Sequence, residues 1–131
     1  MTSREKQVKR TTLSRSECVQ LLGGADLARV VISVRCLPAA LPARISVVDE
    51  NLMLLASPEE AVIVAAHRGE VLSVQIDGLE DDGATWSVMA SGIARWARDD
   101  QPLSERLTHA VTLGARVVAL PLSVVTGERV G

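Results

Sequence analysis

The stretch from Leu54 to Glu70, LLASPEEAVIVAAHRGE, has the residue order of a strand that turns at a proline and then enters a short helix. Such a corner offers free backbone N–H groups and the positive end of a helix dipole, which together favour a bound phosphate. The expected helix starts with Glu59 and Glu60, and the stretch contains no Lys or Arg before Arg68. The corner therefore has the backbone of an anion site without its positive side chains.

The sequence contains no motif for covalent catalysis or for metal binding. There is no G-x-S-x-G motif, and His67 and His109 have no nucleophile nearby in sequence. Cys18 and Cys36 lack metal-ligand spacing and are expected to be reduced thiols packed as small apolar residues. The acidic run at residues 80–82 lacks the alternation of a calcium loop and is expected to be a solvated turn. Any redox or group-transfer chemistry must then come from a bound cofactor.

The size and composition of the chain indicate one globular domain. It has 131 residues, a net charge of −2, two Trp, and no Tyr or Phe. Nucleic-acid binding uses a basic surface and aromatic stacking, so nucleic acid is excluded as an expected partner. No apolar run reaches the roughly 20 residues of a membrane span, and the charged N-terminus lacks a signal-peptide pattern. We therefore expect a cytoplasmic protein that does not bind membranes.

The order of local signals predicts a mainly β domain with peripheral helices. Residues 1–12 are expected to form a flexible N-terminal arm, and residues 13–131 the folded domain. Ser14 and Glu17 form a capping-box pattern for the first helix, the second follows Pro58, and a weaker third spans 102–114. Six strands are predicted, the first two as antiparallel neighbours, at residues 28–35, 39–49, 52–57, 70–77, 85–98 and 115–130.

Strands linked mainly by hairpins suggest a small antiparallel barrel, because closure removes exposed sheet edges. The fifth predicted strand is long enough to bend, and Gly92 would permit a bulge or a sharp coil there. Pro121 marks an edge or a bulge in the sixth predicted strand.

These pieces, in this order, resemble the pyridoxamine 5′-phosphate oxidase-like family of flavin-binding split barrels. The resemblance extends from Leu13 to Val130, and its most specific parts are TWSVMASG at residues 85–92 and VTGER at residues 125–129. It implies a six-stranded antiparallel split barrel that is usually homodimeric. It also implies flavin mononucleotide (FMN) or a deazaflavin in a groove between the two subunits.

The resemblance also implies where the phosphate of the cofactor would lie. In such relatives, the phosphate is held by a cation on the third strand, and by a hydroxyl and a second cation near the following helix start. The corresponding residues here are Leu55, Ser57 and Ala61, and only Ser57 is able to hydrogen-bond a phosphate. Each charge-assisted contact contributes about 1.5–3 kcal/mol, so two losses weaken binding roughly a hundredfold or more. The weakened phosphate site therefore argues against tight flavin binding.

The resemblance implies that four residues line the cofactor groove, namely Arg44, Ser57, Trp86 and Ser87. Arg44 would contact a ring carbonyl or the phosphate; the alternative is an ordinary exposed strand arginine. Trp86 would stack near the flavin ring or fill the dimer interface. The alternative is a structural role in the core. Ser87 would donate a hydrogen bond.

Two functions remain open from the sequence. The first is a homodimeric flavin- or deazaflavin-dependent oxidoreductase that acts on a small molecule. The second is a degenerate split-barrel homodimer that has lost its cofactor and serves as a binding or interaction module. The resemblance favours the first, whereas the apolar Leu55 and Ala61 and the acidic Glu59 and Glu60 favour the second.

Overall fold

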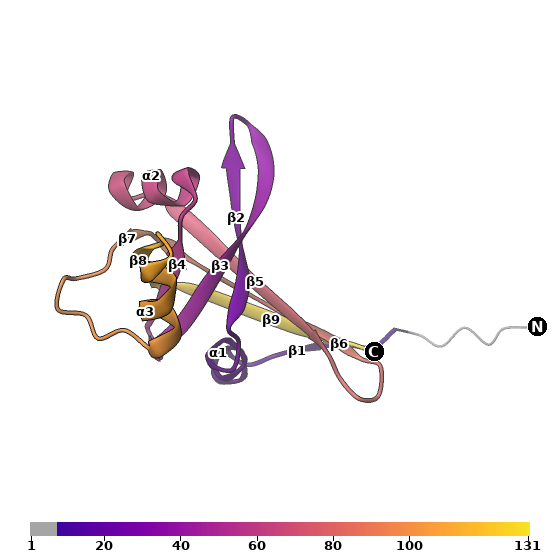
Figure 1. The fold of residues 1–131 in the computed structure, drawn as a ribbon. Coiled ribbons are helices and arrows are strands. Elements are labelled where there is room, and N and C mark those ends of the chain that lie inside the picture. The colour runs from indigo at the N-terminus through magenta and orange to yellow at the C-terminus, as the bar shows by residue number, and fades with distance from the viewer. Residues whose placement is uncertain (1–7) are drawn as a thin grey trace, which may run out of the picture.

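The computed structural model describes residues 8–131, and it confirms a mainly β domain with three helices at the periphery (Figure 1). The strands are β1 (Arg10–Thr12), β2 (Leu27–Val34), β3 (Leu37–Asp49), β4 (Leu52–Ser57), β5 (Val71–Leu79), β6 (Thr85–Ile93), β7 (Arg95–Trp96), β8 (Arg116–Pro121) and β9 (Val124–Val130). The helices are α1 (Arg15–Gly23), α2 (Glu60–Arg68) and α3 (Glu105–Thr112).

The strands form one antiparallel sheet in the order β1-β9-β6-β5-β2-β3-β4-β8-β7. β7 continues β6 after the single residue Ala94, and it pairs with β8 at the far edge of this order. The sheet therefore closes on itself. The barrel wall consists of six strands, which are β5, β2, β3, β4, β8 and the continuous run of β6 and β7.

Two of the six predicted strands are each broken into two. The run 85–98 breaks at Ala94, whose N–H donates to the carbonyl of Glu70 at 2.8 Å. The run 115–130 breaks after Pro121, where the N–H of Leu122 donates to the carbonyl of Asn51 at 2.8 Å. These breaks allow β8 to pair with β4 and β9 to pair with β6, so the barrel is split.

The predicted N-terminal arm is wrong for residues 10–12, and its first seven residues lie outside the described part. Arg10, Thr11 and Thr12 form β1 and pair with Val130, Arg129 and Glu128 of β9. A strand edge with free N–H and C=O groups pairs with any extended segment that reaches it, because backbone pairing needs no apolar side chain.

The helix signals are confirmed, with a small shift at α2. Ser14 Oγ accepts from the N–H of Glu17 at 3.1 Å, and the N–H of Ser14 donates to the Glu17 carboxylate at 3.1 Å, which is the predicted capping box. α2 begins at Glu60 rather than Glu59, because Glu59 has extended backbone and is the N-cap. Among residues 8–131, no helix has the length and apolar character needed to cross a membrane.

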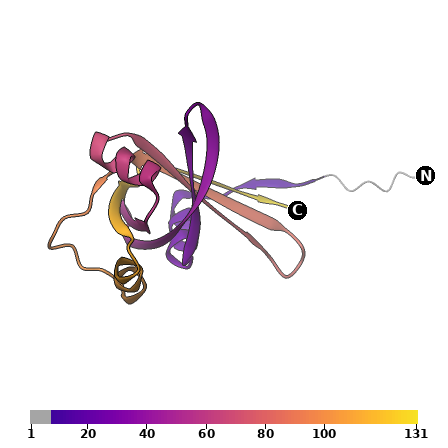
Figure 2. The same ribbon diagram turned by 45° about the horizontal axis from the view of Figure 1, so that its top comes forward.

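The core lies inside the barrel, and a smaller apolar cluster lies outside it. Inward side chains of the barrel strands pack with Cys18 and Leu22 of α1 and with Val62 and Ala65 of α2. Leu107 and Ala110 of α3 cover Leu54, Ala56 and Ala119 on the outer wall. Figures 1 and 2 show α1 and α2 toward opposite ends of the barrel and α3 beside it.

The two cysteines have different environments. Cys18 is fully buried, and burial raises the pKa of its thiol. Cys36 is exposed at the tip of the β2–β3 hairpin with φ 65°, so the expectation that it packs as a small apolar residue is wrong. The reason is its position in a tight turn, which no core element covers. Both cysteines are free thiols.

Candidate functional site

The corner between β4 and α2 is stabilised by its own side chain. Ser57 is fully buried, and its Oγ accepts from the N–H of Glu59 at 3.1 Å. This contact satisfies one backbone donor at the helix start. Ser57 therefore helps to shape the corner, and its oxygen is already engaged within the chain.

The structure corrects the interpretation of Leu55 and leaves that of Ala61 open. Leu55 is 0% exposed and belongs to the core inside the barrel, so a cation at this position would point away from any bound phosphate. The apolar nature of Leu55 is a packing requirement and carries no information about anion binding. Ala61 instead lines a surface groove at the start of α2, where a side chain meets solvent.

Arg44 lies on the outer wall of the barrel beside this corner. It sits on β3 opposite Leu27 of β2 and Ala56 of β4. A hollow of about 260 Å³ opens next to it, and apart from Arg44 its lining is apolar: Leu27, Pro42, Ala43, Ala56, Pro58, Ala110, Leu113 and Ala115. Arg44 Nε is buried and has no hydrogen-bond partner among residues 8–131. A buried donor without a partner favours a ligand that supplies an acceptor.

A second hollow of about 400 Å³ adjoins the first, because Leu27 and Pro42 line both. It extends along the outer face toward Arg29, Gln75 and Asp77. Gln75 Nε2 donates to Asp77 Oδ2 at 3.0 Å, so this end is polar. Together the hollows are apolar at the end near α3 and polar at the end near β5.

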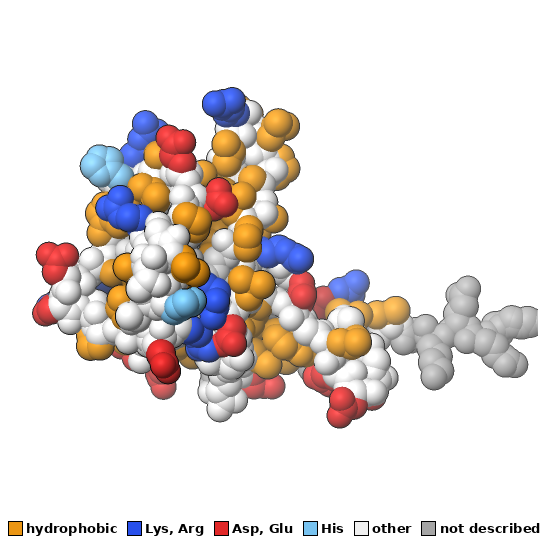
Figure 3. Space-filling view, viewed as in Figure 1, with side chains coloured by type: hydrophobic (Ala, Val, Ile, Leu, Met, Phe, Trp, Pro, Cys, Tyr) orange, Lys and Arg blue, Asp and Glu red, His pale blue; other side chains and the backbone are white. Residues whose placement is uncertain are grey.

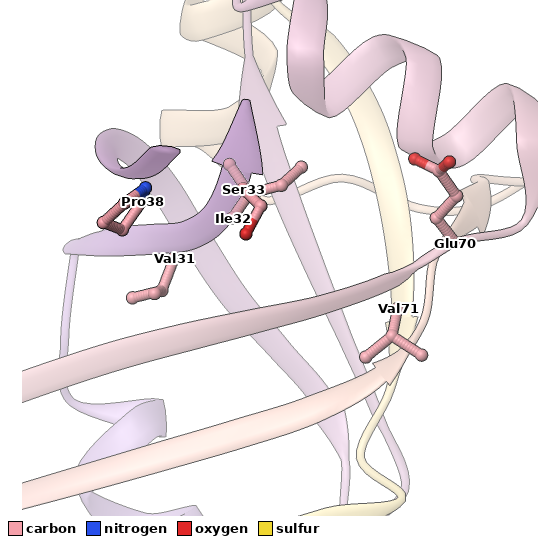
Figure 4. Close-up of a pocket in the computed structure, with 6 residues that line it drawn as sticks. All are labelled: Val31, Ile32, Ser33, Pro38, Glu70 and Val71. Carbon is pink, nitrogen blue, oxygen red and sulfur yellow. The ribbon is translucent and has the colours of Figure 1, made fainter. Parts of the chain in front are cut away.

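A larger groove of about 620 Å³ lies on the other side of the corner, between the β2–β3 hairpin and α2. Glu59, Glu60 and Glu70 line it with Arg35 and Arg68, so neither charge dominates. A neighbouring pocket of about 430 Å³ separates the hairpin from the start of β5, and Figure 4 shows Glu70 and Val71 across from Val31, Ile32, Ser33 and Pro38.

Trp86 and Ser87 do not line one groove within a single chain. Neighbouring residues on a strand point to opposite faces. The Trp86 ring lies against Gly78, where an added Cβ would be 2.4 Å from the ring, and it packs on the core. Ser87 is exposed on the outer face opposite Asp77 and Glu128. Both lie near the β5–β6 hairpin, away from the corner at β4 and α2 (Figure 1). Arg44 faces the outer wall beside Ala56, whereas Ser57, the next residue after Ala56, is fully buried at the end of β4, so the structure does not bring the four predicted residues together at one site.

The acidic turn at residues 80–82 is not simply solvated. Arg129 Nε donates to Glu80 at 2.8 Å, and its Nη2 donates to Asp82 at 3.0 Å. The N–H of Ala84 hydrogen-bonds Asp82 and holds the pKa of that carboxyl below its usual value, and Arg129 acts in the same direction. The turn is thereby tied to β9, which the sequence interpretation missed because the partner lies 47 residues away in the chain.

The outer face of β2, β5, β6 and β9 is apolar at one end. Val71 is 63%, Ile93 59% and Val124 58% exposed, and Val31 and Met89 lie beside them with smaller exposed fractions. Val71 pairs with Ile93, and Ser91 lies between Ser73 and Val124 in the same register. Several large apolar side chains in one exposed patch are typical of an interaction surface.

A closed six-stranded antiparallel barrel, with β9 paired to β6 and β1 paired to β9, defines a split β-barrel protein. The family model for pyridoxamine 5′-phosphate oxidase matches residues 14–129, and the chain belongs to this family. The predicted resemblance is thus confirmed.

The chain is also similar to three known proteins. An uncharacterized protein of Mycobacterium tuberculosis is 34% identical over 127 residues, which covers 90% of this chain and 84% of that protein. An FAD-binding protein from Mycobacterium smegmatis is 26% identical with a TM-score of 0.68, covering 92% of this chain and 98% of its own. An FAD-binding protein from Mesorhizobium loti shares the fold at a TM-score of 0.76 and 18% identity, covering 95% and 99% of the two chains.

Proposed function

We propose that this protein binds a flavin or deazaflavin and acts as an oxidoreductase on a small molecule. The observation that carries the proposal is Arg44, whose buried Nε has no partner and whose guanidinium borders an apolar hollow. FAD binding by the Mycobacterium smegmatis and Mesorhizobium loti proteins supports the same class of ligand.

The residues around the hollow suit the two parts of such a cofactor. Apolar walls from Leu27, Pro42 and Leu113 suit a flat ring system, because most of a ligand pocket is apolar with few polar contacts. The guanidinium of Arg44 suits a phosphate or a ring carbonyl, since it presents several donors in a fixed plane. When bound, the cofactor would supply hydride transfer, and the chain would orient it and exclude water.

We further propose that two copies of the chain associate through the outer face of β2, β5, β6 and β9. The exposed Val71, Ile93 and Val124 support this proposal, because a second copy would remove them from water. Ser87 lies on the same outer face of β6, opposite Asp77, which lines the second hollow. Trp86 remains a core residue in this proposal.

A degenerate module without cofactor is the second candidate function. Ala61 offers no positive charge at the start of α2, and Glu59 and Glu60 flank the same corner. Carboxylates near a phosphate oppose its binding, although solvent screening reduces the effect. The two functions differ in one measurable property, which is flavin affinity.

Titration with FMN, FAD and a deazaflavin, followed by fluorescence, tests the proposal. We expect the wild-type protein to quench at least one of them in the micromolar range, and Arg44→Ala to weaken that binding by about ten- to a hundredfold, the value of one charge-assisted contact. Arg95→Ala is the matched control, because Arg95 is an exposed strand arginine that lines none of these hollows. A folded wild-type protein that binds none of the three ligands would favour the module.

Ile93→Asp tests the association. We expect it to raise the dimer dissociation constant by about a hundredfold, because the interface would bury a carboxylate without a partner. Light scattering after size-exclusion chromatography measures the change. Val48→Asp is the control, since Val48 is 43% exposed on β3, outside this face. A wild-type protein that is monomeric at high concentration would contradict the proposal.

A further inference from the structure

One carboxylate, that of Asp26, lies near the start of β2 and pairs with an arginine of α3. Arg106, in the first turn of α3, forms an ion pair with Asp26, the residue before β2. The carbonyl of Asp26 accepts from the N–H of Ile45 at 3.2 Å, and the next residue, Leu27, pairs with Arg44. Asp26 is thus one register step from Arg44. Figure 3 shows basic side chains with an acidic one beside the position of α3, near the start of β2.

The region has more positive donors than acceptors. The Nε atoms of Arg44 and Arg106 are both buried without a partner, and within residues 8–131 Arg44 forms no ion pair. In this structure the Asp26 carboxylate pairs with Arg106, and the Arg44 guanidinium has no ion-pair partner among residues 8–131.

We propose that Arg106 is a positioning residue that holds Asp26 away from Arg44 and so keeps the Arg44 guanidinium free for an anionic ligand. The inference rests on the proposed flavin site. Without Arg106, the Asp26 carboxylate turns to Arg44 and competes with the ligand anion. Because Asp26 is 64% exposed, this competition is modest in energy.

Arg106 also has a purely structural contact, which the test must separate. Ala110 lies one helical turn after Arg106, and Ala110 and Leu113 line the hollow beside Arg44. The ion pair with Asp26 therefore helps to place the α3 wall. If that were the whole role of Arg106, removal of Asp26 would be as harmful as removal of Arg106.

The decisive experiment is a set of variants titrated with FMN. We expect Arg106→Ala to weaken binding about two- to fivefold, the range of a partly exposed ion pair. Arg106→Lys keeps the pairing and should bind as the wild type does. Asp26→Asn should bind at least as tightly as the wild type, and adding Asp26→Asn to Arg106→Ala should restore affinity. A double variant as weak as Arg106→Ala, or a weak Asp26→Asn variant, would overturn the inference.

A readout without flavin keeps this test separate from the proposed function. The Nε–H signal of Arg44 in a ¹H–¹⁵N NMR spectrum reports what the guanidinium contacts. We expect the signal to move in Arg106→Ala and to return in the double variant with Asp26→Asn. If the wild-type protein binds no flavin, the proposed function fails. The shift of the Arg44 Nε–H signal in Arg106→Ala still tests whether Asp26 turns to Arg44. An Arg44 signal that stays unchanged in Arg106→Ala would contradict the inference.

Discussion

Replacing Gly92 by alanine is expected to destabilise the fold by about 3 kcal/mol or more, a large effect for a single methyl group. An added Cβ at Gly92 would lie 2.0 Å from the carbonyl oxygen of Pro121 and 3.1 Å from its carbonyl carbon. Both atoms belong to the backbone of β8. The clash with the added methyl group is therefore relieved only if the backbone itself shifts. Gly92 is thus the point where β6 crosses the end of β8 and the barrel closes.

Gly23→Ala is the matched control for this prediction. Gly23 is the last residue of α1, and an added Cβ there meets nothing within 4 Å. Alanine has the better helix propensity, so this variant should be neutral or slightly more stable. Urea denaturation followed by circular dichroism measures both variants. Equal stabilities would show that β6 and β8 do not approach as closely as the structure describes.

Leu55→Arg is expected to unfold most of the protein. The side chain is 0% exposed inside the barrel, and a charge placed there has no partner. The loss of packing and the uncompensated charge together cost at least about 4 kcal/mol, which is comparable to the whole stability of a small domain. The outcome is measured as the loss of the cooperative thermal transition.

Ala61→Lys provides the comparison for Leu55→Arg. Ala61 is half-buried and lines the groove beside α2, so a lysine there is able to reach solvent. We expect this variant to fold with near wild-type stability. A folded, stable Leu55→Arg protein would mean that position 55 faces outward. The apolar Leu55 would then again count as a missing phosphate-binding cation.

The local elements were predictable because their signals are local. The capping box of Ser14 and Glu17 acts within one helical turn, and Pro58 ends β4 through its own ring. Alternation and β-branched residues marked the six strands, and hairpin connections indicated an antiparallel barrel. Gly92 and Pro121 indicated irregularities in the last two predicted strands, but the division of each strand at Ala94 and after Pro121 was not predictable, since it depends on a hydrogen bond to a distant carbonyl.

The candidate site was predicted only in part, for the same reason. Arg44 was singled out by the family resemblance, as a polar residue on the second predicted strand, and the structure adds its unpaired Nε and the apolar hollow. Ala110 and Leu113 were missed, because α3 begins more than 60 residues after Arg44 in the chain and carries no motif. The sequence predicted only a weak helix over residues 102–114, without indicating which surface that helix covers, and the Ser104 cap is a finding of the structure.

The sequence by itself determined the three helices, the six main strand runs and their order, because propensity, capping and turn chemistry act over a few residues, and the order of these pieces indicated the family. Only the tertiary structure decided which side chains face one another. Leu55 faces the core while Ala56 faces the hollow beside Arg44, and Trp86 and Ser87 point to opposite faces of β6. The physical reason is that alternate residues of a strand point to opposite faces of the sheet. A binding site uses the residues of one face, and only the closure of the barrel decides which face is inside.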